Sequence, residues 1–278
     1  MIRSVLHPSD LSLGNDAAFA HALRIALAVK GTLTILHSED RPPDDEDDWH
    51  SFPGVRSALV RWGLLPEDAP QSALEPQLGL RIVKSAMYDP SPVRSVLRWT
   101  QNNPCDLIVM ATHAREGVER WLHGSVAADL ARHARLPSLF LPMSPRGFVD
   151  ASSGEASIHN VLAPVDRDPS PGAAVSLAFE LIEACGAKES LVHLLHVGAA
   201  EEAPSVSIDP RKDKRLRRHA RPGPVLDAIL TVAEELQAEL IVMPTRGRHG
   251  FLDVFRGSTT ERVLRQSGRP LLAVPAPQ

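Results

Sequence analysis

Short apolar segments alternate along the chain with longer amphipathic segments, and this alternation indicates repeated pairs of a strand and a helix. The segments at 107–110 and 240–243 are apolar at every position, as in parallel strands that helices cover on both faces. In the first half, the pattern predicts strands at 2–7, 32–37, 79–85, 106–111 and 138–142, and helices at 14–30, 91–102 and 124–135. In the second half, it predicts strands at 159–165, 190–197, 239–244 and 270–274, and helices at 172–185, 223–237 and 257–267, with a third strand that the pattern does not identify. Such repeated units predict a doubly wound α/β fold.

An internal repeat divides the chain into two similar halves. The residues Leu-Ile-Val-Met-Ala-Thr at 107–112 return as Leu-Ile-Val-Met-Pro-Thr at 240–245, and the same offset relates the Gly-Ser pair at 124–125 to the pair at 257–258. We therefore predict two homologous domains, at 1–143 and 158–278. The small and polar residues at 144–157 are interpreted as a linker, and the first domain carries an insert at about 39–76.

Composition and charge exclude several classes of protein. The 30 lysines and arginines face 34 aspartates and glutamates, so the net charge is −4 and the chain lacks the overall basic field of a nucleic-acid-binding protein. Aromatic residues make up only 4%, which leaves few side chains for stacking on bases. Cys105 and Cys185 stand far apart, which excludes a thiolate zinc site and a disulfide scaffold and fits a reducing cytoplasm. The sequence shows no secretion signal and no apolar segment of membrane length, so we expect a cytoplasmic protein without a membrane or nucleic-acid partner.

Candidate binding residues follow the first and fourth strands of the second half. In open α/β sheets, ligands bind beyond the carboxyl ends of the strands, where the strand order reverses. A carboxylate there can accept a hydrogen bond from a ribose hydroxyl, glycines let the backbone approach a phosphate, and a capped helix start offers free N–H groups. The candidate nucleotide-binding residues are Asp166, Thr245, Gly247, Arg248, Gly250, Gly257, Ser258 and Thr259, with further positive charge from Arg246 and Arg256.

These motifs resemble those of the universal stress proteins, in a tandem form that covers nearly the whole chain. The resemblance rests on Val-Leu-x-Pro-x-Asp at 161–166, Leu-Leu-His at 194–196, Leu-Ile-Val-Met at 240–243 and the Gly-Ser helix start. It implies two five-stranded parallel sheets of strand order 3-2-1-4-5 with helices on both faces. It also implies that the halves pack as an intramolecular pseudo-dimer through their last strands, at 138–141 and 271–274, and a further homodimer is left open.

The nucleotide motif of the family is incomplete in this sequence. Family members that bind ATP carry Gly-x-x-Gly, nine residues and then Gly-Ser or Gly-Thr after the fourth strand. The second half departs from this motif at Pro244, and the first half at Ala111 and Ala114. Proline removes an N–H, and alanine adds a Cβ, where a phosphate would approach. The resemblance therefore implies ATP or a related adenine nucleotide in the second half only, with Asp166 toward the ribose and magnesium accompanying the phosphates.

Two other functions stay open beside nucleotide binding in stress adaptation. The family also contains members that bind no nucleotide, so one alternative is a stress protein that acts through protein–protein interaction. The other is a slow ATPase, for which the sequence offers no identifiable base or nucleophile. P-loop and nucleophile-elbow motifs are absent from the sequence, and we expect no catalytic residues.

Two charged segments and several histidines suggest further chemistry. The basic run 211–221 is interpreted as a phosphate or nucleic-acid patch or, more simply, as a solvated crossover strand or loop. Acidic residues at 39–40 and 44–48 occupy the equivalent connection of the first half, so attraction between the two segments, within the chain or between protomers, is a third alternative. His7, His37 and His113, with Asp10 nearby, could offer zinc ligands, but no close ligand spacing supports this, and we expect no metal site.

Overall fold

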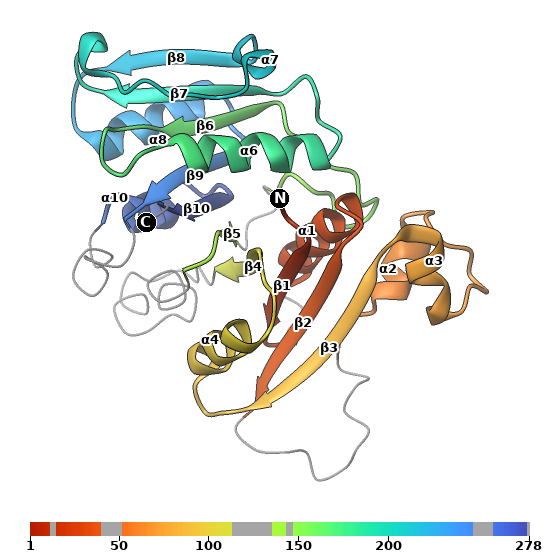
Figure 1. Cartoon of the computed structure of the whole chain (residues 1–278). Coiled ribbons are helices and arrows are strands. Elements are labelled where there is room, and N and C mark those ends of the chain that lie inside the picture. The colour runs from red at the N-terminus through yellow and green to blue at the C-terminus, as the bar shows by residue number, and fades with distance from the viewer. Residues whose placement is uncertain (12–14, 40–51, 113–134, 143–146, 247–257, 277–278) are drawn as a thin grey trace.

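The computed structural model describes residues 1–11, 15–39, 52–112, 135–142, 147–246 and 258–276 (Figure 1). The strands of the first half are β1 (Ser4–Ser9), β2 (Thr32–Glu39), β3 (Arg81–Tyr88), β4 (Leu107–Thr112) and β5 (Ser138–Pro142), and its helices are α1 (Asp16–Ala28), α2 (Val55–Arg61), α3 (Leu74–Leu78) and α4 (Pro92–Asn102). The strands of the second half are β6 (Asn160–Pro164), β7 (Leu191–Val197), β8 (Leu216–Arg221), β9 (Leu240–Thr245) and β10 (Leu271–Pro275), and its helices are α6 (Gly172–Ala184), α7 (Pro210–Asp213), α8 (Val225–Glu235) and α10 (Thr259–Gln266). Short 3₁₀ helices lie at η3 (Gln71–Ala73) and η5 (Ala200–Glu202).

The described strands form one continuous sheet in the order β3-β2-β1-β4-β5-β10-β9-β6-β7-β8. Within each half the strands are parallel and follow the order 3-2-1-4-5, which confirms the predicted fold class. The halves meet where β5 and β10 pair in antiparallel fashion, with Leu139 opposite Leu272. The last strands of the two halves are therefore joined within one chain, as the family resemblance implied.

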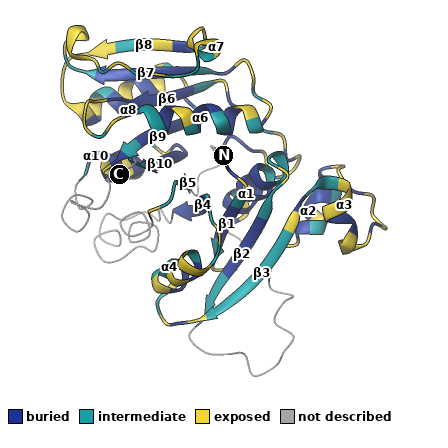
Figure 2. Cartoon of the chain, viewed as in Figure 1, coloured by how far each residue is buried: buried dark blue, intermediate teal, exposed yellow. Residues whose placement is uncertain are grey.

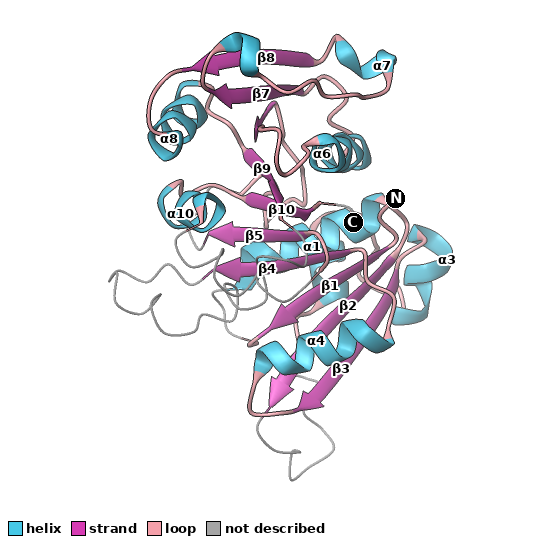
Figure 3. Cartoon of the chain, turned by 60° about the vertical axis from the view of Figure 1, so that its left-hand side comes forward, coloured by secondary structure: helices cyan, strands magenta, loops and turns pink. Residues whose placement is uncertain are grey.

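The helices cover both faces of the sheet and create two hydrophobic cores (Figure 3). On one face, α1 and α6 bury residues such as Leu23 and Phe179 against the sheet. On the other face, α4, α8 and α10 bury residues such as Val96, Ile229 and Val263. The central strands are mostly buried (Figure 2), and the segments 107–110 of β4 and 240–243 of β9 are buried at every position, which explains why these segments are apolar throughout.

The third strand of the second half is β8, and it lies inside the basic run 211–221. Only Leu216 of this strand is buried, because β8 forms the outer edge of the sheet and its other side chains contact solvent. A strand with so little burial has no apolar alternation, and the hydrophobic pattern therefore could not identify it. The second part of the basic run, 216–221, therefore forms a largely exposed crossover strand, which is one of the structures that the sequence suggested for it. The predicted helix at 124–135, apart from Arg135, and the acidic run at 44–48 lie outside the described residues.

The described part of the segment between the halves, residues 147–157, packs against the first domain. Phe148 is buried and its ring meets the ring of His21 edge-on, with the centroids 4.4 Å apart. Further along, the backbone forms an isolated antiparallel bridge, and the indole N–H of Trp62 donates to the carbonyl oxygen of Ala151 at 3.1 Å. The joining segment therefore contacts both α1 and the C-terminal end of the insert helix α2. Among the described residues, no helix has the length and apolar character that crossing a membrane requires.

Candidate functional site

Strands β6 and β9, the first and fourth strands of the second half, separate after a short stretch of pairing. Their shared register ends at Leu162 and Ile241. In contrast, β6 stays paired with β7 as far as Pro164, and β9 stays paired with β10 as far as Thr245. The carboxyl ends of β6 and β9 therefore diverge at the point where the strand order reverses, and this is where open α/β sheets bind ligands.

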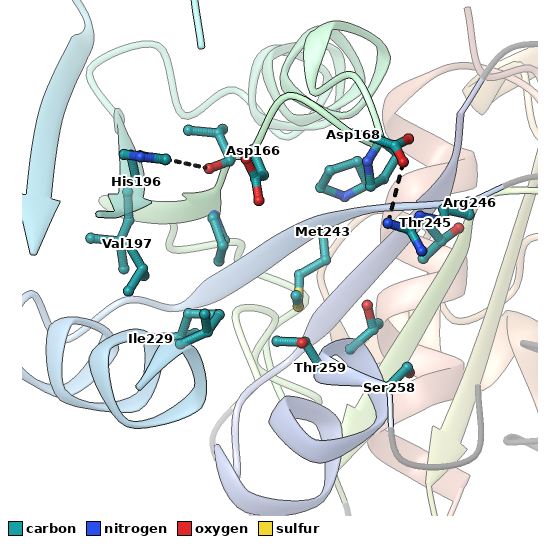
Figure 4. A pocket seen from close by; sticks show the side chains of 17 residues that line it. Asp166, Asp168, His196, Val197, Ile229, Met243, Thr245, Arg246, Ser258 and Thr259 are labelled. Atoms are coloured by element: carbon teal, nitrogen blue, oxygen red, sulfur yellow. Dashed lines mark hydrogen bonds and ion pairs between the residues drawn. The ribbon is translucent and has the colours of Figure 1, made fainter. Parts of the chain in front are cut away.

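A pocket of about 430 Å³ occupies this divergence (Figure 4). The apolar part of its lining consists of Val165, Leu195, Val197, Val225, Ile229 and Met243, with the prolines at 164, 169 and 244. The polar part consists of Asp166, Asp168, His196, Thr245, Arg246, Ser258, Thr259 and Thr260. A mainly apolar lining with a few convergent polar groups, at this volume, is typical of a site for a small organic ligand.

Asp166 places an exposed carboxylate beside the pocket, directly after β6. Its Oδ1 atom accepts a hydrogen bond from the backbone N–H of Arg167 at 2.7 Å, and no described side chain is bonded to it. A carboxylate held in this way can accept hydrogen bonds from the hydroxyl groups of a ligand.

Arg246 lies at the same mouth and forms an ion pair with Asp168, with Nη2 and Oδ2 3.2 Å apart. Both side chains are more than half exposed, so the pair contributes only about 0–1 kcal/mol. An anionic ligand could therefore exchange with Asp168 at the guanidinium at little cost.

The start of α10 borders the pocket from the other side. Ser258 caps this helix, because its Oγ atom accepts a hydrogen bond from the backbone N–H of Glu261 at 3.2 Å. Thr259 and Thr260 follow in the first turn and line the pocket. The remaining N–H groups of the first turn and the positive end of the helix dipole favour an anion at this place.

The structure brings four of the predicted site residues together: Asp166, Thr245, Ser258 and Thr259 line one pocket. The other four, Gly247, Arg248, Gly250 and Gly257, lie outside the described residues, as does Arg256. Sequence reasoning missed the apolar lining from β7, β9 and α8, and it also missed Asp168 and His196. Each of these residues looks like ordinary core or loop in the sequence, and the only available signal was its place at a strand end or in the first turns of a helix.

The histidines considered as zinc ligands contact the backbone. The Nδ1 atom of His7 lies 2.9 Å from the carbonyl oxygen of Val109, and burial lowers the pKa of His7 to about 4. His37 approaches the carbonyl oxygen of Ser9 through Nδ1 at 2.8 Å. In the described part of the chain, no group of three potential ligands is placed to hold a metal ion, and His113 lies outside it.

Comparisons with known proteins identify the family. The model of the universal stress protein family matches residues 1–142 and again residues 157–275. The chain belongs to the universal stress protein family. It carries two domains of this family in tandem.

Relatives and solved structures agree with this assignment. A universal stress protein of Mycobacterium tuberculosis is 23% identical over 95% of this chain and 94% of its own length. A universal stress protein of Methanocaldococcus jannaschii is 27% identical over 50% of this chain and 81% of its own length. The crystal structure of a universal stress protein from Archaeoglobus fulgidus has a TM-score of 0.61 at 21% identity, covering 98% of this chain and 96% of that one, and it supports the fold.

The two universal stress protein domains differ at equivalent positions around the carboxyl ends of the strands. Asp10, the equivalent of Asp166, accepts a hydrogen bond from the side-chain amide of Asn15, whose place is taken in the second domain by Pro171. The hydroxyl of Thr112, the equivalent of Thr245, donates to the carbonyl oxygen of Leu141 at 3.1 Å. Both polar groups have protein partners in the first domain, whereas their equivalents line the pocket in the second.

The apolar lining differs as well. Val197, on the pocket side of β7, corresponds to Ser38 in the first domain. The Ser38 hydroxyl lies 2.8 Å from the Oγ atom of Ser95 and donates to the carbonyl oxygen of Asp89 at 3.0 Å. A hydrogen-bonded serine pair in the first domain thus replaces an apolar wall of the second.

Proposed function

We infer that this universal stress protein is a ligand-binding protein of stress adaptation whose second domain binds ATP or a related adenine nucleotide. One observation carries the proposal: the diverging ends of β6 and β9 enclose a pocket that is apolar in one part and polar, beside a helix start, in the other. An adenine nucleotide has the same division, with a flat base of low polarity, a ribose and a charged phosphate chain.

The described residues fit each part of such a ligand. Val197, Ile229 and Met243 offer apolar surface for the base. The exposed carboxylate of Asp166 offers an acceptor for a ribose hydroxyl. The first turn of α10 and the guanidinium of Arg246 offer N–H donors and positive charge for phosphates, and magnesium would accompany these phosphates.

The differences between the halves support the proposal that only one domain binds the nucleotide. In the first domain, Asp10 and Thr112 are already bonded to Asn15 and to the carbonyl oxygen of Leu141. A nucleotide there would have to displace these contacts, and burying a polar group without its partner costs about 1–3 kcal/mol. The alanines at 111 and 114 add to this cost, because each replaces a glycine of the family's nucleotide motif and places a Cβ where a phosphate would approach.

Titration calorimetry with ATP tests the proposal on matched variants. Ile229→Trp adds bulk to the pocket lining of α8, and we expect it to weaken ATP binding at least tenfold. Val96→Trp makes the equivalent change in α4 of the first domain and should leave the affinity unchanged. Circular dichroism of both variants shows whether they are folded.

Three outcomes would contradict the proposal or its details. A stoichiometry near two, or equal losses from the two variants, would defeat occupation of one domain only. No binding at millimolar ATP would favour the alternative of a universal stress protein that acts through protein–protein interaction. Phosphate release measured alongside the titration would separate binding from slow hydrolysis.

A further inference from the structure

Strand β8 ends the sheet on the side of the second domain, and the direction of its backbone groups can be read from two hydrogen bonds. The N–H of Val192 donates to the carbonyl oxygen of Arg215, and the N–H of Gly198 donates to that of Arg221. In a parallel pair, alternate residues of each strand bond to the neighbour. The register therefore turns 217, 219 and 221 toward β7 and leaves the backbone N–H and C=O groups of Arg218 and Ala220 on the outer side.

This outer side is open in the described part of the chain. No described residue bonds to the outward backbone groups of Arg218 or Ala220, whereas the outward carbonyl of Leu216 accepts a hydrogen bond from the guanidinium of Arg217 at 2.8 Å. Figure 2 shows exposed residues along β8, in contrast to the buried central strands. An open row of backbone donors and acceptors is a template for one more strand.

The charge at this edge is strongly positive. The segment 211–221 carries seven arginines and lysines, of which Lys214 and Arg217 have no carboxylate within 4 Å among the described residues. Arg218 and Arg221 do form ion pairs, with Asp213 at 3.1 Å and Glu235 at 3.0 Å. These pairs are at least half exposed and contribute about 0–1 kcal/mol each, so they can exchange with another carboxylate.

The geometry points to β8 as a docking edge for an acidic, extended segment of another protein, which adds to the sheet as an eleventh strand. Backbone hydrogen bonds to Arg218 and Ala220 supply the pairing, and the surrounding arginines select the charge. Pairing between the β8 edges of two copies is disfavoured, because arginines would then face arginines. The shortage of aromatic side chains argues against a nucleic acid in the same place. This inference is independent of the nucleotide pocket.

The probe is a labelled peptide of ten residues in which glutamate and valine alternate. Its binding to the full chain is followed by fluorescence anisotropy at low salt. We expect the acidic peptide to bind and a peptide of alternating lysines and valines not to bind. Ala220→Pro removes one outward N–H without removing a bond to β7, and proline is tolerated on such an edge. We expect this variant to bind the acidic peptide at least tenfold more weakly.

The opposite edge of the sheet offers a matched control. Ala86 of β3 occupies the position equivalent to Ala220, and the N–H of Arg81, which donates to the carbonyl oxygen of Gly31, shows that the N–H of Ala86 also points outward. Ala86→Pro should therefore leave binding unchanged. The double variant Lys214→Glu with Arg217→Glu breaks no ion pair of the described residues and should also reduce binding at least tenfold.

A second probe does not depend on the folding of any variant. The acidic peptide with alternate backbone amides methylated keeps its charge but loses the donors for one ladder, and it should bind at least tenfold more weakly. Equal binding of the methylated and unmethylated peptides would show charge attraction without strand addition and would overturn the inference. Equal binding by Ala220→Pro and the wild-type chain, or no binding of the acidic peptide at all, would overturn it as well.

Discussion

The Nε2 atom of His21 accepts two hydrogen bonds from the segment that joins the domains, from the backbone N–H groups of Phe148 at 3.0 Å and Val149 at 3.1 Å. The Nδ1 atom donates to the carbonyl oxygen of Ala17 at 2.6 Å, which fixes the neutral ring in a single tautomer. A proton on Nε2 would face two N–H groups. One buried ring thus holds the joining segment against α1.

Replacement of His21 by leucine should lower the free energy of unfolding by about 2–6 kcal/mol. The reason is that two buried N–H groups lose their acceptor, at about 1–3 kcal/mol each. Urea unfolding followed by circular dichroism measures the change. His159→Leu, at a histidine that is 71% exposed, is the control and should change the stability little. Similar losses in both variants would contradict the role assigned to His21.

Stability should fall as the pH drops from about 6.5 toward 4. Burial lowers the pKa of both His7 and His21 to about 4, whereas the unfolded chain takes up these protons near the ordinary value of 6.5. The stabilisation from a neutral buried ring is therefore complete above pH 6.5, decreases as the pH falls, and is lost at about 4, with an upper limit of about 3 kcal/mol for each ring.

Urea unfolding at a series of pH values checks this prediction. Asp150, whose pKa the hydroxyl of Ser152 and nearby N–H groups lower to about 2, affects the stability only as the pH approaches 3.8, the ordinary value in the unfolded chain, and thus only at the lower end of this window. The His21→Leu variant should show a shallower slope between pH 6.5 and 4. A free energy of unfolding that stays constant over this range in the wild-type chain would refute the prediction.

Gly154→Ala should destabilise the chain by at least 2 kcal/mol more than Gly63→Ala. Both glycines have a left-handed backbone, with φ of +71° and +69°, so alanine is strained equally at the two positions. An added Cβ at Gly154 would lie 2.2 Å from the Cδ2 atom of Trp62, whereas nothing lies within 4 Å at Gly63. The difference between the two denaturation midpoints isolates the packing of the joining segment on α2, and equal midpoints would show that this packing is dispensable.

Asp166→Ala should weaken ATP binding at least tenfold, because the ribose would lose a charged acceptor, worth about 1.5–3 kcal/mol in a hydrogen bond. Asp10→Ala is the matched change in the first domain. It should leave the affinity unchanged and lower the stability instead, because Asn15, which is buried, would lose its partner. Calorimetry and thermal unfolding of both variants give the two readouts. A loss of affinity in Asp10→Ala would instead point to a nucleotide in the first domain.

The fold could be predicted because its central strands are buried on both faces. β4 and β9 are apolar at nearly every position, and the repeat between them made the two domains visible. β8 could not be predicted from its burial pattern, because an edge strand with one buried residue has no hydrophobic signal. The packing of the joining segment was also invisible, since its small and polar residues look like those of a free linker.

The candidate site could be predicted only in its polar part. Asp166 and Ser258 follow strands or begin helices in recognisable motifs, and both line the pocket. Val197 and Ile229 look like core residues in the sequence, and only the divergence of β6 from β9 turns them toward a cavity. The ion pair between Asp168 and Arg246 joins two loops that are distant in the sequence, so no local pattern could indicate it.

The antiparallel junction of β5 and β10 also has an evolutionary consequence. In a symmetric dimer of identical chains, each substitution enters both binding sites at once. Here the strand ends of the two domains are encoded separately, so a difference such as asparagine at 15 and proline at 171 can arise in one domain without altering the other. One domain can thereby change at its strand ends while it continues to pair with its neighbour, and the two remain in a fixed ratio at any dilution.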